Sequence, residues 1–231
     1  MAELPYVTIV VSGEDAREFL QNQLTQDMAL VEASDAPVLS AWCNPKGRVI
    51  CLFRVSVTAD GFALALPQDL ADNVAKRLTM FRFRSKVMFK TRDTDAAELG
   101  PGGGEPDWEV QNLEAGIPHI GAAQSEEFTS HMLNLDLLGA VSLDKGCYPG
   151  QEIVARTHYR GASKRRMLRF TAKSPVQAGA EVLVDDRKVG EVVNAIGTDL
   201  LVVMPVAKAD ATLKSNGTTL SQVELPYSIP E

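Results

Sequence analysis

The sequence predicts an α+β fold followed by a small β-barrel, and three observations carry this prediction. Helical and strand-like apolar patterns mix over roughly the first 160 residues, whereas about six short strand-like runs follow them. The 231 residues are 45% hydrophobic, which is enough to bury a substantial core. We therefore expect an α+β domain at residues 1–164 and a β-barrel domain at residues 165–231, whose core would be marginal alone.

The first third of the chain predicts a strand meander between two helices. A β-branched run at residues 7–11 is followed by apolar residues at helical spacing, for which Ser12 supplies an N-cap. A second helix is expected after Pro67, because proline favours the first helical turn. Three strands are expected between these helices, at 38–43, 49–57 and 62–66.

The middle of the chain predicts a strand and then a flexible connection. Phenylalanine and cationic residues alternate over residues 81–90, which favours a half-buried strand. The stretch 93–107 contains Gly100-Pro101-Gly102-Gly103-Gly104 and reads as a flexible loop. Barrel strands are then expected at 167–172, 181–184, 188–195, 200–206 and 222–225.

Cysteine and histidine usage indicates the compartment and argues against a metal centre. Cys43, Cys51 and Cys147 form no Cys-x-x-Cys pair, and their odd number suits a reducing compartment. The N-terminus lacks the basic and apolar regions of a signal peptide, and no run is long enough to span a membrane. We expect a cytoplasmic protein without a bound metal, since the three histidines show no ligand spacing.

The charge distribution leaves a nucleic-acid partner open. The formal net charge is −7, yet residues 76–92 hold seven Lys/Arg and residues 156–169 hold six, without an acid in either window. The two windows could line one groove that binds tRNA directly. Two separate solvated faces are an equally good account of them.

The stretch Lys145-Gly146-Cys147-Tyr148-Pro149-Gly150-Gln151-Glu152 is the strongest candidate for chemistry. It places a lone cysteine between glycines, beside a lysine and ahead of an expected helix. The Lys145 ammonium and the helix N-terminus would both favour the Cys147 thiolate. The alternative is a cysteine buried as a small hydrophobic residue.

This stretch, with Val154-Ala155-Arg156 and Arg160-Gly161 behind it, resembles the signature of the YgfZ family of folate-binding proteins. That family is related to the T-protein, the aminomethyltransferase of the glycine cleavage system. The resemblance runs from Tyr6 to about Arg166 and continues weakly to the C-terminus. It implies a T-protein-like, folate-binding domain at residues 1–164, with tetrahydrofolate or a folate derivative as the cofactor. It also implies a role in iron–sulfur cluster assembly or repair and thereby in tRNA modification, with iron–sulfur enzymes or assembly proteins as partners.

The segment from Trp108 to Pro118 is the second candidate site. A pterin ring stacks on an indole, and its parallel N–H donors suit one carboxylate such as Glu114. A core tryptophan and a surface glutamate are the plainer account. The resemblance assigns folate contacts to Trp108 and Glu114, and Tyr6 falls where relatives have tryptophan. Arg84 and Arg160 are candidates to bind the anionic glutamate tail, as are Lys46, Arg82 and Lys164.

Two departures from the family pattern bear on catalysis. The T-protein turn Gly-Gly-x-x-Asp-Asp, which carries its catalytic aspartate, aligns with residues 47–52, where no aspartate is present. Aminomethyl transfer by that mechanism is therefore not expected. Typical YgfZ relatives also carry a longer segment where this chain has residues 93–107. The alternatives that stay open are a one-carbon transferase or demethylase with another acid, and a binding module in which Cys147 only packs.

Overall fold

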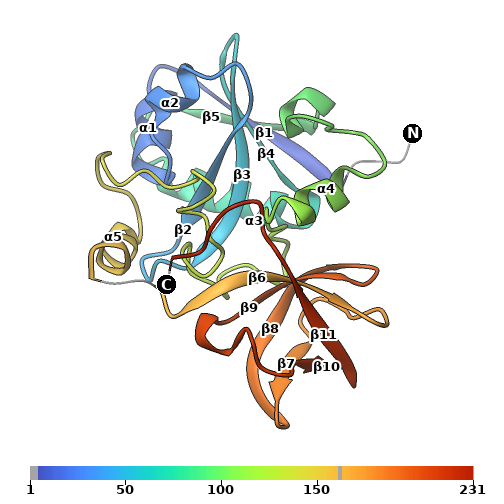
Figure 1. The fold of residues 1–231 in the computed structure, drawn as a ribbon. Coiled ribbons are helices and arrows are strands. Elements are labelled where there is room, and N and C mark those ends of the chain that lie inside the picture. The colour runs from blue at the N-terminus through green and yellow to red at the C-terminus, as the bar shows by residue number, and fades with distance from the viewer. Residues whose placement is uncertain (1–4, 161–162, 231) are drawn as a thin grey trace. The chain divides into compact units, whose positions relative to one another are not determined.

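The structure is a computed structural model that describes residues 5–160 and 163–230, and within these the chain divides into two compact units (Figure 1). The first unit runs to Glu105 and adds Ile120–Ser130 and Leu138–Ala155. The second comprises Pro106–His119, His131–Leu137 and the residues from Arg156 onward. Because segments of the two units alternate along the chain, a functional division at residue 164 stays a prediction.

The first unit is built on an antiparallel sheet with the strand order β2-β3-β4-β1-β5. Alternate residues such as Ile9 and Val11 face a core that α-helices cover. The helices are α1 (Ala16–Gln23), α2 (Met28–Glu32) and α3 (Gln68–Phe81). The strands are β1 (Tyr6–Ser12), β2 (Val38–Cys43), β3 (Val49–Thr58), β4 (Gly61–Pro67) and β5 (Met88–Asp93). The predicted meander and both predicted helices are confirmed. The predicted N-cap is wrong, because Ser12 is the last residue of β1, and α1 begins after Asp15.

The strand predicted over residues 81–90 is wrong in its first part. Helix α3 continues to Phe81, and Phe83 adopts a φ of 47° in the loop that follows. Strand β5 begins only at Met88, which pairs with Ser12 at the end of β1. Residues before Met88 therefore have no β1 residue to pair with, and the alternating pattern falls in an irregular loop.

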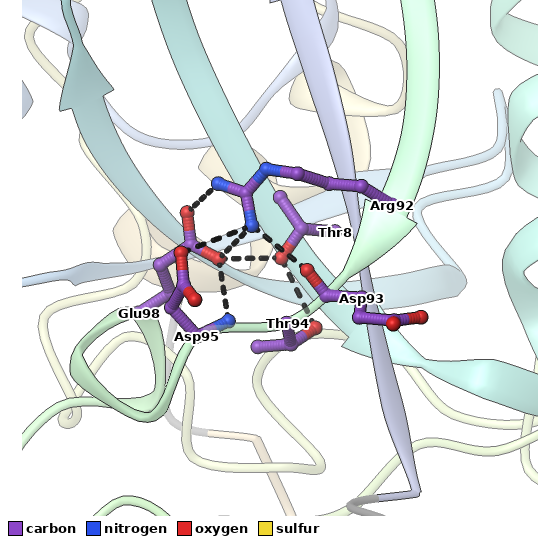
Figure 2. A network of polar contacts seen from close by, with 6 residues as sticks. All are labelled: Thr8, Arg92, Asp93, Thr94, Asp95 and Glu98. Carbon is purple, nitrogen blue, oxygen red and sulfur yellow. Dashed lines mark hydrogen bonds and ion pairs between the residues drawn. The ribbon is translucent and has the colours of Figure 1, made fainter.

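The glycine-rich connection begins with an ordered segment. It contains a 3-10 helix, η1 (Ala96–Leu99), in which Glu98 is buried (Figure 2). The Glu98 carboxylate accepts hydrogen bonds from the Thr8 hydroxyl at 2.8 Å, the Asp95 N–H at 3.1 Å and Arg92 Nη1 at 3.0 Å. Arg92 Nη2 also contacts its other oxygen. The network ties η1 to β1 and β5.

Glu98 stays ionised in this network although it is buried. Burial opposes ionisation, but the hydrogen bonds from Arg92, Thr8 and the Asp95 backbone outweigh it and lower the pKa of Glu98. Removing either partner of such a buried ion pair destabilises the fold, because it leaves the other charge buried and unpaired. The composition of the connection does not predict such an anchor.

The second unit contains a closed six-stranded barrel, which confirms the predicted C-terminal β-barrel. Its strands are ordered β10-β11-β6-β9-β8-β7, and their inward residues form the core. The described residues also form the helices α4 (Trp108–Glu114) and α5 (Gln151–Arg160) and the 3-10 helix η2 (Val206–Lys208). The first half of α5 is assigned to the first unit and its second half to the second. The strands are β6 (Arg165–Ala172), β7 (Glu181–Val184), β8 (Arg187–Ile196), β9 (Asp199–Pro205), β10 (Lys214–Ser215) and β11 (Thr218–Val223). Across residues 5–160 and 163–230, no helix has the length and apolar character needed to cross a bilayer.

Candidate functional site

The cysteine loop, residues 145–150, leads directly into α5 in the first unit. The helix expected after Gly150 is present and begins at Gln151. Cys147 is exposed, whereas Cys43 and Cys51 are buried in β2 and β3. Burial raises the pKa of the Cys43 thiol to about 12 and that of Cys51 well above its usual value. Of the three thiols, only Cys147 is open to solvent.

Lys145 binds the cysteine loop to the end of α1. Its ammonium donates hydrogen bonds to the carbonyl oxygens of Gln21 at 2.5 Å, Leu24 at 2.6 Å and Gln26 at 3.0 Å. Carbonyls at a helix C-terminus lack intrahelical donors, and a cation there also complements the helix dipole. All three ammonium donors are thus engaged by the α1 end and the turn after it. Activation of Cys147 by this ammonium stays a prediction.

Gly150 and Gly47 bring the loop against the β2–β3 turn. Gly150 has a φ of 82° and Gly47 a φ of 70°, a region that favours glycine. A Cβ added to Gly150 would lie 2.5 Å from the Asn44 carbonyl oxygen and 2.8 Å from the Gly47 Cα. This close backbone approach explains why the signature has glycine at position 150.

Gly146, beside the cysteine, is different. Its φ lies outside the left-handed region, and a Cβ there would meet no atom within 4 Å. Tyr148, on the other side of Cys147, is buried. Neither backbone strain nor packing therefore accounts for Gly146, which leaves open space next to the exposed thiol.

The second unit holds the other candidate cluster, at the end of α4. Glu114 is exposed, and its Oε1 lies 3.0 Å from Arg169 Nη2 of strand β6. Arg169 also pairs with Asp199 at 3.2 Å. No donor among the described residues reaches Glu114 Oε2, and Oε1 can accept a second hydrogen bond. The carboxylate is therefore held in place while it retains acceptor capacity.

Two features lie next to Glu114 in this unit. The Gly116 carbonyl accepts a hydrogen bond from the Tyr227 hydroxyl at 3.0 Å, which ties the α4 end to the C-terminal segment. Tyr227 and Arg169 also line a cavity of about 440 Å³, a volume in the range of small-molecule sites. Trp108 is 3% exposed, so direct stacking of its indole on a pterin stays a prediction.

The remaining predicted folate contacts are spread over the chain. Tyr6 is half-buried at the start of β1, and Arg84 is exposed in the loop after α3. Arg160 is the last residue of α5, and its side chain falls outside the described part of the chain. Arg54 of β3 interacts with Tyr6: burial lowers the pKa of the Arg54 guanidinium, and the interaction with Tyr6 raises it. An arginine within an otherwise apolar strand is the sequence feature that marks this position.

Residues of the first unit occupy the positions where the resemblance places the T-protein carboxylates. Cys51 and Leu52 lie there, buried in β3. Within the described ranges, no group of three or more His, Cys, Asp or Glu side chains could hold a metal ion. The geometry thus offers an exposed thiol in one unit and an anchored carboxylate in the other.

The sequence of the chain is similar to those of several bacterial proteins. The chain is 31% identical over 272 positions to an uncharacterised protein of Haemophilus influenzae, covering 98% of this chain and 97% of that one. It is 27% identical to proteins named tRNA-modifying protein YgfZ from Enterobacter sp. and Escherichia coli, covering 96% of this chain and 90% of each. No protein-family model matches.

The fold also matches a solved structure. The glycine cleavage system aminomethyltransferase T from Bartonella henselae superposes with a TM-score of 0.76 at 14% identity, covering 97% of this chain and 84% of that one. This match confirms the T-protein-like fold with its small barrel. The sequence alignments extend over 272 to 300 positions although the chain has 231 residues, so these relatives carry segments that it lacks.

Proposed function

Because the chain belongs to the YgfZ family, we propose that it binds a reduced folate and supports tRNA modification through iron–sulfur enzymes, with Cys147 as the reactive thiol. The coarser part, a YgfZ-like role in tRNA modification, draws on relatives that carry that name. The finer parts, folate and iron–sulfur enzymes, draw on the signature and on the two clusters described above. Free cysteines suit a reducing cytoplasm.

The observation that carries the proposal is the contrast between Cys147 and its neighbours. Lys145 caps α1, Tyr148 packs inside and Gly150 allows a backbone contact, so each has a structural reason to be present. Cys147 is exposed beside the open space at Gly146. A residue held outward on an anchored loop is placed for contact with another molecule.

The folate proposal rests on Glu114. A carboxylate with free acceptor capacity suits the paired N–H donors of a pterin, and Arg169 orients it. A reduced folate would supply a one-carbon unit carried on N5 or N10, or the redox chemistry of its reduced pterin ring. We do not propose aminomethyl transfer, because Cys51 and Leu52 occupy the carboxylate positions of the T-protein turn.

Glu114→Gln is expected to weaken tetrahydrofolate binding by about 10-fold or more, since it removes charge-assisted hydrogen bonds. Anaerobic calorimetric titration measures this effect. Glu109→Gln, also exposed and on the same helix, serves as the matched control and should bind as the parent does. A folded parent that does not bind tetrahydrofolate would remove the folate part of the proposal.

Cys147→Ser is expected to abolish the support of tRNA modification, because it removes the proposed reactive thiol. The free energy of unfolding should not change, because the side chain is exposed. The measurement is the modified-nucleoside content of tRNA in a bacterial strain that lacks its own copy and expresses the variant. Asp144→Asn, an exposed neighbour, is the control and should restore the nucleosides. If Cys147→Ser restores them equally, the chain acts as a binding module whose thiol is dispensable.

A further inference from the structure

The segment 81–86, with the sequence Phe-Arg-Phe-Arg-Ser-Lys, comprises the last residue of α3 and most of the loop that leads to β5, and it has an unusual surface. We call it the arginine–phenylalanine loop. Phe83 at its centre is 85% exposed, and its φ of 47° is a strained conformation for an aromatic residue. An exposed ring in a strained backbone gains nothing from the hydrophobic core. Folding therefore does not explain Phe83.

The loop is nevertheless well held. The Arg82 N–H donates to the Thr79 carbonyl at 3.3 Å, and the Ser85 N–H donates to the Arg82 carbonyl at 2.8 Å. The rings of Phe81 and Trp42 form a T-shaped pair, with centroids 5.9 Å apart. Phe81 is thus an anchor, and Phe83 is presented outward from an ordered turn.

The charges around Phe83 are predominantly positive. Arg82 and Arg84 flank it in sequence, and neither has an acidic partner among the residues that the structure describes. Within the described residues, the Arg82 guanidinium donates only to the Val87 carbonyl, at 3.3 Å. The acids that contact this loop and α3 are engaged by other residues: Glu14 pairs with Lys86, Asp15 accepts from the Lys86 N–H, and Glu126 pairs with Arg77.

The ligand chemistry follows from the residue types. An exposed aromatic ring stacks on any unpaired base, and an arginine guanidinium binds phosphate with two donors and also stacks on bases. A duplex hides its base faces, so a ring at the tip of a loop suits single-stranded nucleic acid. The net charge of −7 over the whole chain makes the uncompensated cations of this loop a local exception.

We propose that the arginine–phenylalanine loop binds an unpaired region of RNA, with Phe83 stacked on a base and Arg82 and Arg84 on neighbouring phosphates. The choice of RNA over other polyanions rests on the proposed role in tRNA modification. The loop lies in the first unit, and the site needs no residue of the second.

The test is fluorescence anisotropy of the full chain with a labelled RNA hairpin, compared with a fully paired RNA duplex of equal length. The parent should bind the hairpin more tightly. Phe83→Ala should weaken hairpin binding by about 10-fold with an unchanged salt slope, as expected for a lost stacking contact. Arg84→Gln should reduce the slope of log affinity against log salt by about 0.7, as expected for one lost phosphate contact on a single strand.

Matched controls are exposed residues elsewhere. Leu30→Ala removes an exposed apolar side chain of the same unit, and Lys173→Gln removes an exposed cation; both should bind as the parent does. Equal thermal midpoints for parent and variants establish that folding is intact.

Three results would overturn the proposal: hairpin affinity unaltered by Phe83→Ala, equal affinity for hairpin and duplex, or binding to anionic phospholipid vesicles in place of RNA. The nucleoside assay separates this inference from the proposed function. If the parent restores the modified nucleosides and Cys147→Ser does not, but the parent does not bind the hairpin, only the RNA-binding role of the loop is refuted. If the parent binds the hairpin and Phe83→Ala weakens that binding, but the parent does not restore the nucleosides, only the proposed function is refuted.

Discussion

Lys145→Met is expected to lower the free energy of unfolding by about 3 kcal/mol or more, because the variant leaves buried carbonyl groups without their charged donor. Lys145 bonds to Gln21, Leu24 and Gln26, and the methionine side chain fills similar space without donating. Chemical denaturation measures the change. Lys173→Met, at an exposed position, is the matched control and should stay within about 0.5 kcal/mol of the parent.

The difference in unfolding free energy between the parent and Lys145→Met is expected to depend on pH. Burial lowers the pKa of Lys145 to about 8, an effect that Asp27 opposes. A lysine in an unfolded chain has a pKa of about 10.4, so between these values the unfolded state binds more protons. Linkage then raises the unfolding free energy of the parent as the pH increases through this window. Lys145→Met lacks this titration, so the gap between the two proteins should widen from about pH 8 to about pH 10. A gap that narrows would contradict the assignment.

Gly150→Ala is expected to be the second large effect, at about 3 kcal/mol, because two penalties combine. The first is the positive φ, and the second is the approach of the new Cβ to the Asn44 carbonyl and to Gly47. Both contacts are with backbone atoms, which cannot move aside as a flexible side chain would. The displaced loop should also impair any function that depends on Cys147.

Two other glycines separate these penalties. Gly139 has a φ of 67° but open space around its Cβ position, so Gly139→Ala reports backbone strain alone, at about 1 kcal/mol. Gly146 has neither feature, so Gly146→Ala should leave stability unchanged. The denaturation midpoint should be lowest for Gly150→Ala, intermediate for Gly139→Ala and highest for Gly146→Ala. A Gly150→Ala cost no greater than that of Gly139→Ala would show that the backbone contact is loose.

The elements that sequence patterns predicted well are those whose partners lie close in the chain. In β2, β3 and β4, apolar residues either alternate with polar ones or form continuous runs, and turn residues separate the strands. Each strand then pairs with its neighbour in the sequence, so the local pattern agrees with the final pairing. The pattern over residues 81–90 misled because strand formation there depends on β1, which ends at Ser12. Nothing in the local sequence records where a partner 76 residues away stops.

The candidate site shows the same limit. The signature identified Cys147 as the residue to examine, and the structure finds it exposed. Lys145 is readable in the sequence as a neighbour of the thiol, but its hydrogen-bond acceptors lie about 120 residues earlier in the chain and are not. The Glu114 pair with Arg169 likewise needs a barrel strand that no spacing rule links to α4. Chemistry-bearing residue types are readable locally, but their partners follow from tertiary packing.

The anchored start of the glycine-rich connection determines where this chain can change length. Arg92, Thr8 and Glu98 fasten its first half to the sheet, whereas Glu105 and Pro106 are exposed and lie beyond that anchor. Extra residues between Glu105 and Pro106 would lengthen a segment that is already outside the packed structure, at a modest entropic cost. That junction is accordingly the natural place for an epitope or a fluorescent label, and it is also a point where evolution could add or remove a segment without disturbing the sheet.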